Sequence, residues 1–294
     1  MEIRTDLALE AKEIFFSKSD SKSISGVISK EINIKGFDIT TVEISDEKGA
    51  KAIGKPIGKY VTFEIEPFLT RDKNSFEEAC FILRDILESI LNKKDGSVLV
   101  AGLGNSAITA DALGPFAVKN TMVTRHLVER VPEHFGSMRP VAAIAPGVLA
   151  TTGLETDEII KAVAADKDIS AIVVIDALAS RSLDRLCRTI QISDTGIIPG
   201  SGVGNHRNAI NRETMGVPVV SIGVPTVVYA GTLAHDIAAE AGFKNTDLSK
   251  YGGDLIVTPR DIDENIRDMA KVIGYGINLS LHDITVGDVD MFLS

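Results

Sequence analysis

The hydrophobic and polar positions along the chain follow two different patterns. Between residues 24 and 65, β-branched and polar residues alternate, and glycine and proline separate the runs. This alternation is typical of short antiparallel strands. Farther along, apolar runs recur that do not alternate, namely SVLVAGLG from residue 97, AAIAPGV from 142, AIVVIDAL from 171 and VPVVSIGVP from 217. Such runs suit strands buried on both faces of a parallel sheet, so we expect a small β-rich N-terminal part and a mostly parallel central sheet.

Apolar residues at helical spacing lie between these runs. Residues 75–94 place apolar side chains one helical turn apart, and Ser75 followed by Glu78 has the sequence of a capping box. Shorter helices are expected over residues 114–130, 157–166 and 232–241, and a long C-terminal helix over 258–282. Strands that alternate with helices predict a single α/β domain with helices on both faces of the sheet.

The composition is that of an ordinary globular protein, and it argues against several function classes. Hydrophobic residues make up 44% of the 294 residues, and 31 basic against 41 acidic residues give a formal net charge of −10. Direct binding of nucleic acid needs cations that face phosphates and is not expected. The apolar stretches are shorter than the roughly 20 residues of a membrane span, and the first residues carry acids where a secretory signal is apolar. We expect a cytoplasmic protein in which Cys80 and Cys187 are buried thiols.

Cofactor and metal motifs are incomplete in this chain. Gly102 and Gly104 follow a predicted strand, but a dinucleotide-binding fingerprint would have a third glycine where the chain has Ala107. We interpret the two glycines as a tight turn between strand and loop. The glycine-rich segment 200–204 lacks the Gly-Lys-Ser/Thr ending of a phosphate-binding loop. The five histidines form no HExxH pair and no GxSxG sequence occurs, so no cofactor, metal or serine nucleophile is expected.

Two aspartates lie next to predicted strands. Asp176 ends the apolar run from residue 171, and Asp111 lies in the loop after the run from residue 97. In an open parallel sheet the strand ends face the ligand crevice, so both acids are expected in one cleft. Two adjacent carboxyl groups cannot both ionise cheaply, and such a pair can act as base and acid on a water that attacks a peptide carbonyl. The alternative is that each aspartate caps a following helix.

Asp194 belongs to an Asp-Thr-Gly tripeptide, which is the motif of pepsin-like proteases. Those enzymes are all-β proteins that carry the motif in both lobes, whereas here it occurs once in an α/β pattern. A local turn is therefore the preferred interpretation. Because Asp194 is close in sequence to the glycine-rich segment 200–204, it is also a candidate cleft residue.

Eight sequence blocks resemble the germination protease (spore protease) family of endospore-forming bacteria. They occur in family order across nearly the whole chain: RTDLALEA from residue 4, GLGNSAITADALGP from 102, TRHL from 124, APGVLATTGLET from 145, IDALASRS from 175, TIQISDTGIIPGSGVGN from 189, ETMGVPVVSIGVPTVV from 213 and LIVTPRDID from 255. Unrelated proteins would not share eight ordered blocks of this length.

The resemblance implies an atypical aspartic endopeptidase that degrades small acid-soluble spore proteins during germination, in the forespore and spore core. It implies that the two essential aspartates are Asp111 and Asp176. The implied fold is phosphorylase/hydrolase-like α/β, similar to that of hydrogenase-maturation proteases, whose corresponding acids bind nickel. The family itself is expected to need no metal and to form homotetramers. The residues that we expect to support the cleft are Asn105, Asp194, Gly202 and Gly204.

The resemblance further implies a zymogen that removes a short propeptide. Family substrates are cut after the first acid of a motif of the form Thr-Glu-(Phe/Ile)-Ala-Ser-Glu, and the segment TDLALE from residue 5 has acid, apolar residue, alanine and acid at the same offsets. We predict self-cleavage between Asp6 and Leu7, which divides the chain into a propeptide, residues 1–6, and one α/β protease domain, residues 7–294. Arg125 or Arg181 would bind an acidic substrate side chain, and N–H groups of segment 200–204 would stabilise the oxyanion.

Two other functions remain open from the sequence. The same acids could be ligands in a metal-dependent maturation-type hydrolase, which chelation would inactivate. The chain could also be a catalytically silent protein that binds spore proteins without cutting them.

Overall fold

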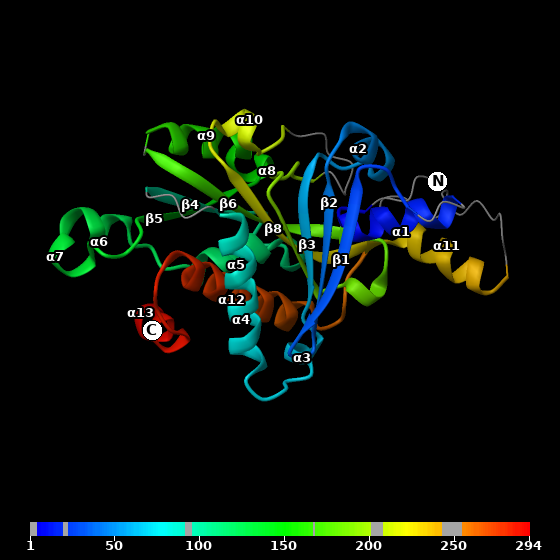
Figure 1. The fold of residues 1–294 in the computed structure, drawn as a ribbon. Coiled ribbons are helices and arrows are strands. Elements are labelled where there is room, and N and C mark those ends of the chain that lie inside the picture. Colours follow the sequence, from blue (N-terminus) through cyan, green and yellow to red (C-terminus); the bar gives the residue numbers. More distant parts are fainter. Residues whose placement is uncertain (1–4, 20–22, 92–95, 167, 201–207, 243–254) are drawn as a thin grey trace.

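The computed structural model describes residues 5–19, 23–91, 96–166, 168–200, 208–242 and 255–294. Within these residues, nine strands form one sheet in the order β1-β2-β3-β7-β8-β6-β4-β5, and β9 pairs with β8 beside this path. Helices cover both faces of the sheet (Figure 1). This arrangement confirms the α/β fold expected from the alternation of apolar runs and helical segments.

The four apolar runs form the parallel part of the sheet, as predicted. They are the strands β4 (Ser97–Leu103), β5 (Val141–Gly147), β6 (Ile169–Ser180) and β8 (Val219–Tyr229). β4 pairs in parallel with β5 and β6, and β6 pairs in parallel with β8. Every residue of β8 is buried, which explains why its sequence shows no alternation.

The N-terminal β-rich part extends the same sheet instead of standing beside it. β1 (Val27–Ile34), β2 (Phe37–Ile44) and β3 (Gly58–Glu64) form the predicted antiparallel set. β7 (Thr189–Ser193) lies antiparallel between β3 and β8 and joins the two parts. The sequence pattern did not predict β7 or the two-residue β9 (Ile256–Val257), which pairs with the end of β8.

One face of the sheet packs against α4 (Ser75–Ile90), α5 (Leu113–Lys119) and α12 (Ile262–Leu281). Val173 and Ile175 of β6 point to this face, whereas Ile172 and Val174 point to the other. The other face carries α9 (Thr156–Asp166) and α10 (Arg212–Met215), together with α1 (Ala8–Lys18) and α2 (Glu47–Ile53) over β2 and β3. Since strand side chains alternate between faces, every second residue of β6, including Asp176, belongs to the face of α1 and α9.

Several predicted helix boundaries need correction. The segment 114–130 is not one helix but two, α5 and α6 (Arg125–Arg130), and the C-terminal helix starts at residue 262 instead of 258. The capping box at Ser75 is wrong, because Asn74 is the N-cap of α4 and makes no side-chain cap. α11 (Ala230–Glu240) follows β8 directly, as expected for 232–241. The short elements are α3 (Glu66–Leu69), α7 (Pro132–Phe135), α8 (Leu149–Thr152), α13 (Val286–Leu293), η1 (Thr109–Asp111) and η2 (Leu183–Arg185).

No helix among the described residues is both long and apolar enough to span a membrane.

Candidate active site

Asp176 lies within β6, at the point where its neighbour β4 ends. The last β4–β6 pair is Gly102 with Ile175, so Asp176 is the first residue of β6 beyond that pairing. It is only 6% exposed, and its Oδ1 accepts the N–H of Ala177 at 3.0 Å. β6 continues to Ser180, so the expectation that Asp176 ends its strand is wrong, and so is the alternative that it caps a helix. The strand continues because β8 remains paired with it after β4 has ended.

Asp111 ends the short η1 turn in the loop that follows β4. Its Oδ2 accepts the N–H of Asn105 at 2.8 Å, which closes the loop on itself. Gly104 has a φ of 107°, and a Cβ there would lie 2.0 Å from the carbonyl oxygen of Asp111, so only glycine fits this turn. α5 begins at Leu113 with Ala112 as its N-cap, so Asp111 is not a helix cap either. The interpretation as a tight turn is confirmed for Gly104, whereas Gly102 lies within β4 and pairs with Ile175.

The η1 turn covers the carboxyl ends of β6 and β8. Thr226 of β8 donates a hydrogen bond from its hydroxyl to the carbonyl of Ala110 at 2.7 Å. Ala110 also packs against a small cluster formed by Ala179, Val227 and Tyr229. Asp111, which follows Ala110 directly, therefore lies at the edge of the sheet where β4 ends and no longer pairs with β6. The geometry brings the two predicted acids to one edge, while their catalytic role stays a prediction.

Asp176 of β6, Gly223 of β8 and Gln191 of β7 lie side by side and form a row across three neighbouring strands. Gly223 of β8 pairs with Asp176 on one side and with Gln191 of β7 on the other. The three residues share the face of the sheet that carries α1 and α9. A cavity of about 210 Å³ opens on this face, lined among others by Gln191, Gly223 and Leu178. The side chain of Leu178 fills the space above Gly223, since a Cβ at Gly223 would lie 2.5 Å from it.

The N-terminal segment bonds to β6 and to Gln191 next to this row. The backbone N–H of Asp6 donates to the carbonyl of Ala179 at 2.9 Å, and the carboxylate of Asp6 accepts the N–H of Ala179 at 2.9 Å. Gln191 bonds on both sides of Leu7, because its Nε2 donates to the carbonyl of Asp6 at 3.2 Å and its Oε1 accepts the N–H of Ala8 at 2.7 Å. Leu7 and Ala8 are fully buried. The peptide bond between Asp6 and Leu7 is thus fixed between Ala179 of β6 and Gln191 of β7.

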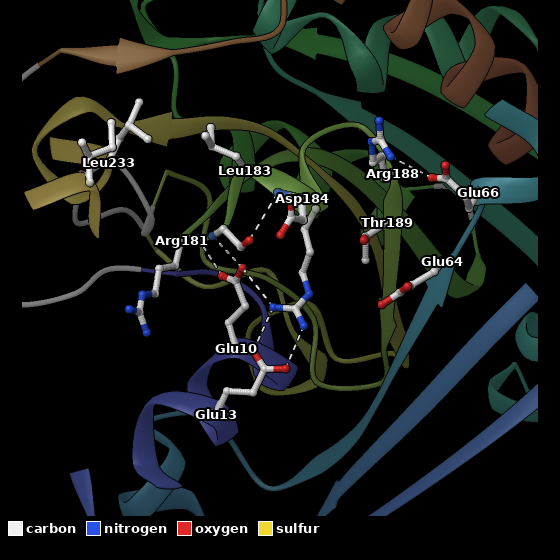
Figure 2. Close-up of a pocket in the computed structure, with 13 residues that line it drawn as sticks. Glu10, Glu13, Glu64, Glu66, Arg181, Leu183, Asp184, Arg188, Thr189 and Leu233 are labelled. Atoms are coloured by element: carbon white, nitrogen blue, oxygen red, sulfur yellow. Dashed lines mark hydrogen bonds and ion pairs between the residues drawn. The ribbon is translucent and has the colours of Figure 1, made fainter. Parts of the chain in front are cut away.

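Glu10 anchors the other end of this segment. It is 1% exposed, and its carboxylate accepts the backbone N–H groups of Arg181 at 2.7 Å and Ser182 at 2.9 Å. The guanidinium of Arg185 lies 3.3 Å from Glu10 and 2.7 Å from Glu13. Figure 2 shows these two glutamates next to each other among the residues that line a pocket. Burial lowers the pKa of Arg185, but the two glutamates outweigh it and raise the pKa above its ordinary value. The first turn of α1 is therefore held against the residues that follow β6.

Lys55 fixes the upstream side of the same segment. Its Nζ donates to the carbonyl of Thr5 at 3.1 Å. Burial lowers the pKa of the Lys55 ammonium, while the charges of Asp6 and Glu10 act in the opposite direction. A buried ammonium needs such acidic neighbours to stay charged.

A family model described as "Germination protease" matches residues 5–240. The chain belongs to the germination protease family. Germination proteases of Clostridium perfringens and Caldanaerobacter subterraneus subsp. tengcongensis are 43% and 47% identical over 323 and 308 residues, covering 99% and 95% of this chain and 99% and 94% of theirs. The germination protease of Bacillus subtilis is 38% identical over 345 residues, covering 96% of this chain and 94% of its own. The resemblance seen in the eight sequence blocks is confirmed, and the expectation that the protein is a protease is confirmed with it.

Among solved structures, the chain is similar to a NiFe hydrogenase maturation protease from Thermococcus kodakarensis KOD1. The sequence identity is 16% and the TM-score 0.36, and the match covers 65% of this chain and 98% of the other.

Two further predicted site residues of this germination protease have structural contacts. Asn105 shapes the loop, since its Oδ1 accepts the N–H of Ala107 at 3.0 Å while its own N–H holds Asp111. Asp194 ties β7 to β3, because its Oδ1 accepts the N–H of Lys59 at 2.8 Å. This contact fits the interpretation of the Asp-Thr-Gly tripeptide as a local turn. Gly202 and Gly204, with most of the glycine-rich segment, lie outside the described residues.

The predicted arginines lie differently from expectation. Arg125 forms an ion pair with Glu129 one helical turn away on α6, at 2.7 Å. Arg181 contributes its backbone N–H to Glu10, and the guanidinium beside that acid belongs to Arg185. In the part of the chain that the structure describes, no three His, Cys, Asp or Glu side chains are grouped as a metal site would need.

Sequence reasoning missed Gln191, Lys55 and Arg185. Gln191 gives a weak signal, as the one amide in the short apolar segment TIQIS. No local sequence pattern identifies Lys55 or Arg185, since each contacts the N-terminal segment from a distant position in the sequence.

Proposed function

We propose that this protein is a self-processing endopeptidase that degrades small acid-soluble spore proteins in the spore core during germination. The observation that carries the proposal is the pair of hydrogen bonds that Gln191 makes to the Asp6 carbonyl and to the Ala8 N–H. Gln191 and Asp176 are both paired with Gly223, so they lie in the same row of the sheet. A peptide bond that hydrogen bonds on both sides hold against the sheet of a protease has the position of a substrate. The propeptide is then residues 1–6, and residues 7–294 form the protease domain.

Asp111 and Asp176 act as an acid–base pair. One carboxylate is ionised and takes a proton from a water as its oxygen attacks the carbonyl carbon of Asp6. The other is protonated and gives its proton to the nitrogen of Leu7 when the peptide bond breaks. Both acids end as they began after exchanging protons with water, and no metal is required for this sequence of steps.

Gln191 stabilises the transition state in this scheme. Its Nε2 already donates to the carbonyl oxygen of Asp6 at 3.2 Å. Negative charge develops on that oxygen as water adds, so the same hydrogen bond strengthens when the barrier is crossed. The hydroxyl of Thr5 accepts the N–H of Leu7 at 3.0 Å, which orients the leaving amide.

The experiment uses the full chain with a small acid-soluble spore protein at mildly acidic pH. Wild type is compared with Asp111→Asn and Asp176→Asn, and fragments are mapped by mass spectrometry. Asp194→Asn is the matched control, since that acid holds a strand junction. Cleavage after acidic residues that both dyad variants abolish, and that a chelator leaves unchanged, supports the proposal. Cleavage that survives in either dyad variant contradicts it.

We also propose that the protein acts as a homotetramer, as its family resemblance implies. Sedimentation velocity of the full chain tests this, and a monomer at all concentrations would contradict it.

A further inference from the structure

β8 carries a bulge close to the candidate active site. Leu178 of β6 pairs with Pro225, and the next residue of β6, Ala179, pairs with Val227. Thr226 is therefore the extra residue between these two pairs. A bulge interrupts the regular pairing and turns a side chain in a new direction, and bulges are frequent next to active sites.

The polar groups of Thr226 have partners in two other parts of the fold. Its hydroxyl donates to the carbonyl of Ala110 in the η1 turn at 2.7 Å, and its own carbonyl accepts the hydroxyl of Thr258 at 2.9 Å. Thr258 directly follows β9, which pairs with the end of β8. Thr226 is fully buried, and a buried hydroxyl needs such a partner. The bulge thus joins the turn that carries Asp111 to the sheet.

Close backbone packing holds the other side of Asp111. A Cβ at Gly114, in the first turn of α5, would lie 2.6 Å from the carbonyl oxygen of Ile175, so α5 contacts β6 directly. Ile175 is the residue before Asp176. Asp111 therefore lies between two attachments, which are the hydrogen bond at Ala110 and the contact at Gly114. Together they fix the backbone that carries the Asp111 carboxyl relative to β6 and β8.

Thr226 supplies an attachment that the loop cannot supply by itself. The bond that Asp111 accepts from the N–H of Asn105 closes the loop on itself, whereas the bond from Thr226 joins the loop to β8. An acid–base pair needs both carboxyl groups held closely in place, since a displacement of about 1 Å can slow a reaction about a hundredfold.

We propose that Thr226 is a positioning residue, which holds the η1 turn so that the carboxyl of Asp111 meets Asp176 in the geometry that proton transfer needs. The proposal rests on the proposed function, because it gives Thr226 a role only through the acid–base pair. Thr226 acts through Ala110 and takes no part in bond breaking. The bulge in β8 belongs to the site in this account, because it directs the hydroxyl of Thr226 to the turn.

The test is the rate of self-cleavage of the full chain at mildly acidic pH, measured from the intact mass. Because the Asp6–Leu7 bond is part of the chain, this rate reports the chemical step without a substrate-binding step. Thr226→Val keeps the size of the side chain and removes the hydroxyl, and it is expected to cut itself ~100-fold more slowly. Thr226→Ser keeps the hydroxyl and is expected to retain most of the wild-type rate.

Thr121→Val is the matched control. Thr121 is also buried, and its hydroxyl also donates to a backbone carbonyl, that of Ala117 at 3.0 Å, near the far end of α5. Both variants lose one buried hydrogen bond, but Thr121→Val should cut itself at the wild-type rate. An unchanged rate in Thr226→Val, an equal slowing in Thr121→Val, or a Thr226→Ser chain as slow as Thr226→Val would overturn the positioning role and leave the proposed function intact.

Hydrogen exchange of the η1 turn, followed by mass spectrometry, separates the two proposals. The N–H of Asp111 donates to the carbonyl of Ile108 at 2.8 Å within this turn. Thr226→Val is expected to speed exchange in residues 105–112 by about tenfold, because the turn opens more easily without its attachment. Thr121→Val should leave this exchange unchanged.

Faster exchange in Thr226→Val alone, in chains that never cut themselves, would retain the attachment and remove the proposed function. Exchange that Thr226→Val leaves unchanged would overturn the positioning role whether or not cleavage occurs.

Discussion

Gln191 and Asp176 lie in one row across the sheet, each paired with Gly223 from opposite sides. The amide of Gln191 bonds the carbonyl of Asp6 and the N–H of Ala8, so it spans the peptide bond that we expect to be cut. This relationship connects the fold to the chemistry, because the register of three strands places the bond and the acid on the same face of the sheet.

Gln191→Ala is expected to slow self-cleavage by about a hundredfold, because a donor to the developing oxyanion is lost. The measurement is the rate at which the intact mass of the chain falls by residues 1–6. Ser193→Ala is the control, since Ser193 lies two residues farther along the same face and its hydroxyl bonds Thr195. An unchanged rate in Gln191→Ala would show that this contact has no role in cutting.

Gly104→Ala is expected to lower the free energy of unfolding by about 2 kcal/mol or more and to abolish activity. The added Cβ would collide with the backbone of Asp111 and move its carboxylate. Gly153→Ala provides the comparison, because Gly153 also has a positive φ, of 72°, but open space around it. That variant should lose only about 1 kcal/mol and stay active. Urea unfolding and peptide cleavage measure both effects, and equal losses would contradict the account of the turn.

His282 is expected to make the protein less stable in acid. Burial, assisted by the charge of Arg139, lowers its pKa to about 4 from an ordinary 6.5, and neither ring nitrogen has a hydrogen-bond partner among the described residues. Protonation therefore favours the unfolded chain. The free energy of unfolding therefore has its full value above about pH 6.5 and decreases as the pH falls toward about 4.

Between these two pH values, protonation linked to His282 lowers the free energy of unfolding by roughly 3 kcal/mol. Urea unfolding across the window should show a shallower pH dependence in His282→Gln than in wild type. His126→Gln, which removes an exposed histidine, should leave the dependence unchanged. If the free energy of unfolding changed with pH to the same extent in wild type and His282→Gln, His282 would not be the cause of the acid sensitivity.

Cys80 and Cys187 are expected to resist thiol reagents in the folded protein. Burial raises the pKa of Cys187 to about 12 and raises that of Cys80 as well, so neither forms the reactive thiolate near neutral pH. A colorimetric disulfide reagent should detect no thiol in the native protein and both thiols in guanidinium chloride. Fast labelling of either cysteine in the native state would contradict the burial.

The sequence predicted those parts of the fold that depend on local pattern. Continuous apolar runs such as that around Val173 identify buried parallel strands, and the spacing in residues 75–94 identifies α4. The pattern could not predict β7, a strand of five residues that forms between β3 and β8. It also could not show that β6 passes beyond Asp176, because that depends on its pairing with β8, which continues after β4 has ended.

The candidate site was predicted only in part for a similar reason. Asp111 and Asp176 follow apolar runs and so could be found from the sequence. Gln191 meets Ala8 across 183 positions of the chain, and Arg185 meets Glu10 across 175. Such contacts depend on how the N-terminal segment crosses the folded sheet, and neither residue type in isolation indicates it.

The most direct test of the central claim is the intact mass of the purified full chain after incubation at mildly acidic pH, beside Asp111→Asn and Asp176→Asn. The account predicts that wild type loses residues 1–6 and begins at Leu7, while both variants keep their full mass. A wild-type chain that stays uncut, is cut elsewhere, or is cut equally in the variants would contradict it.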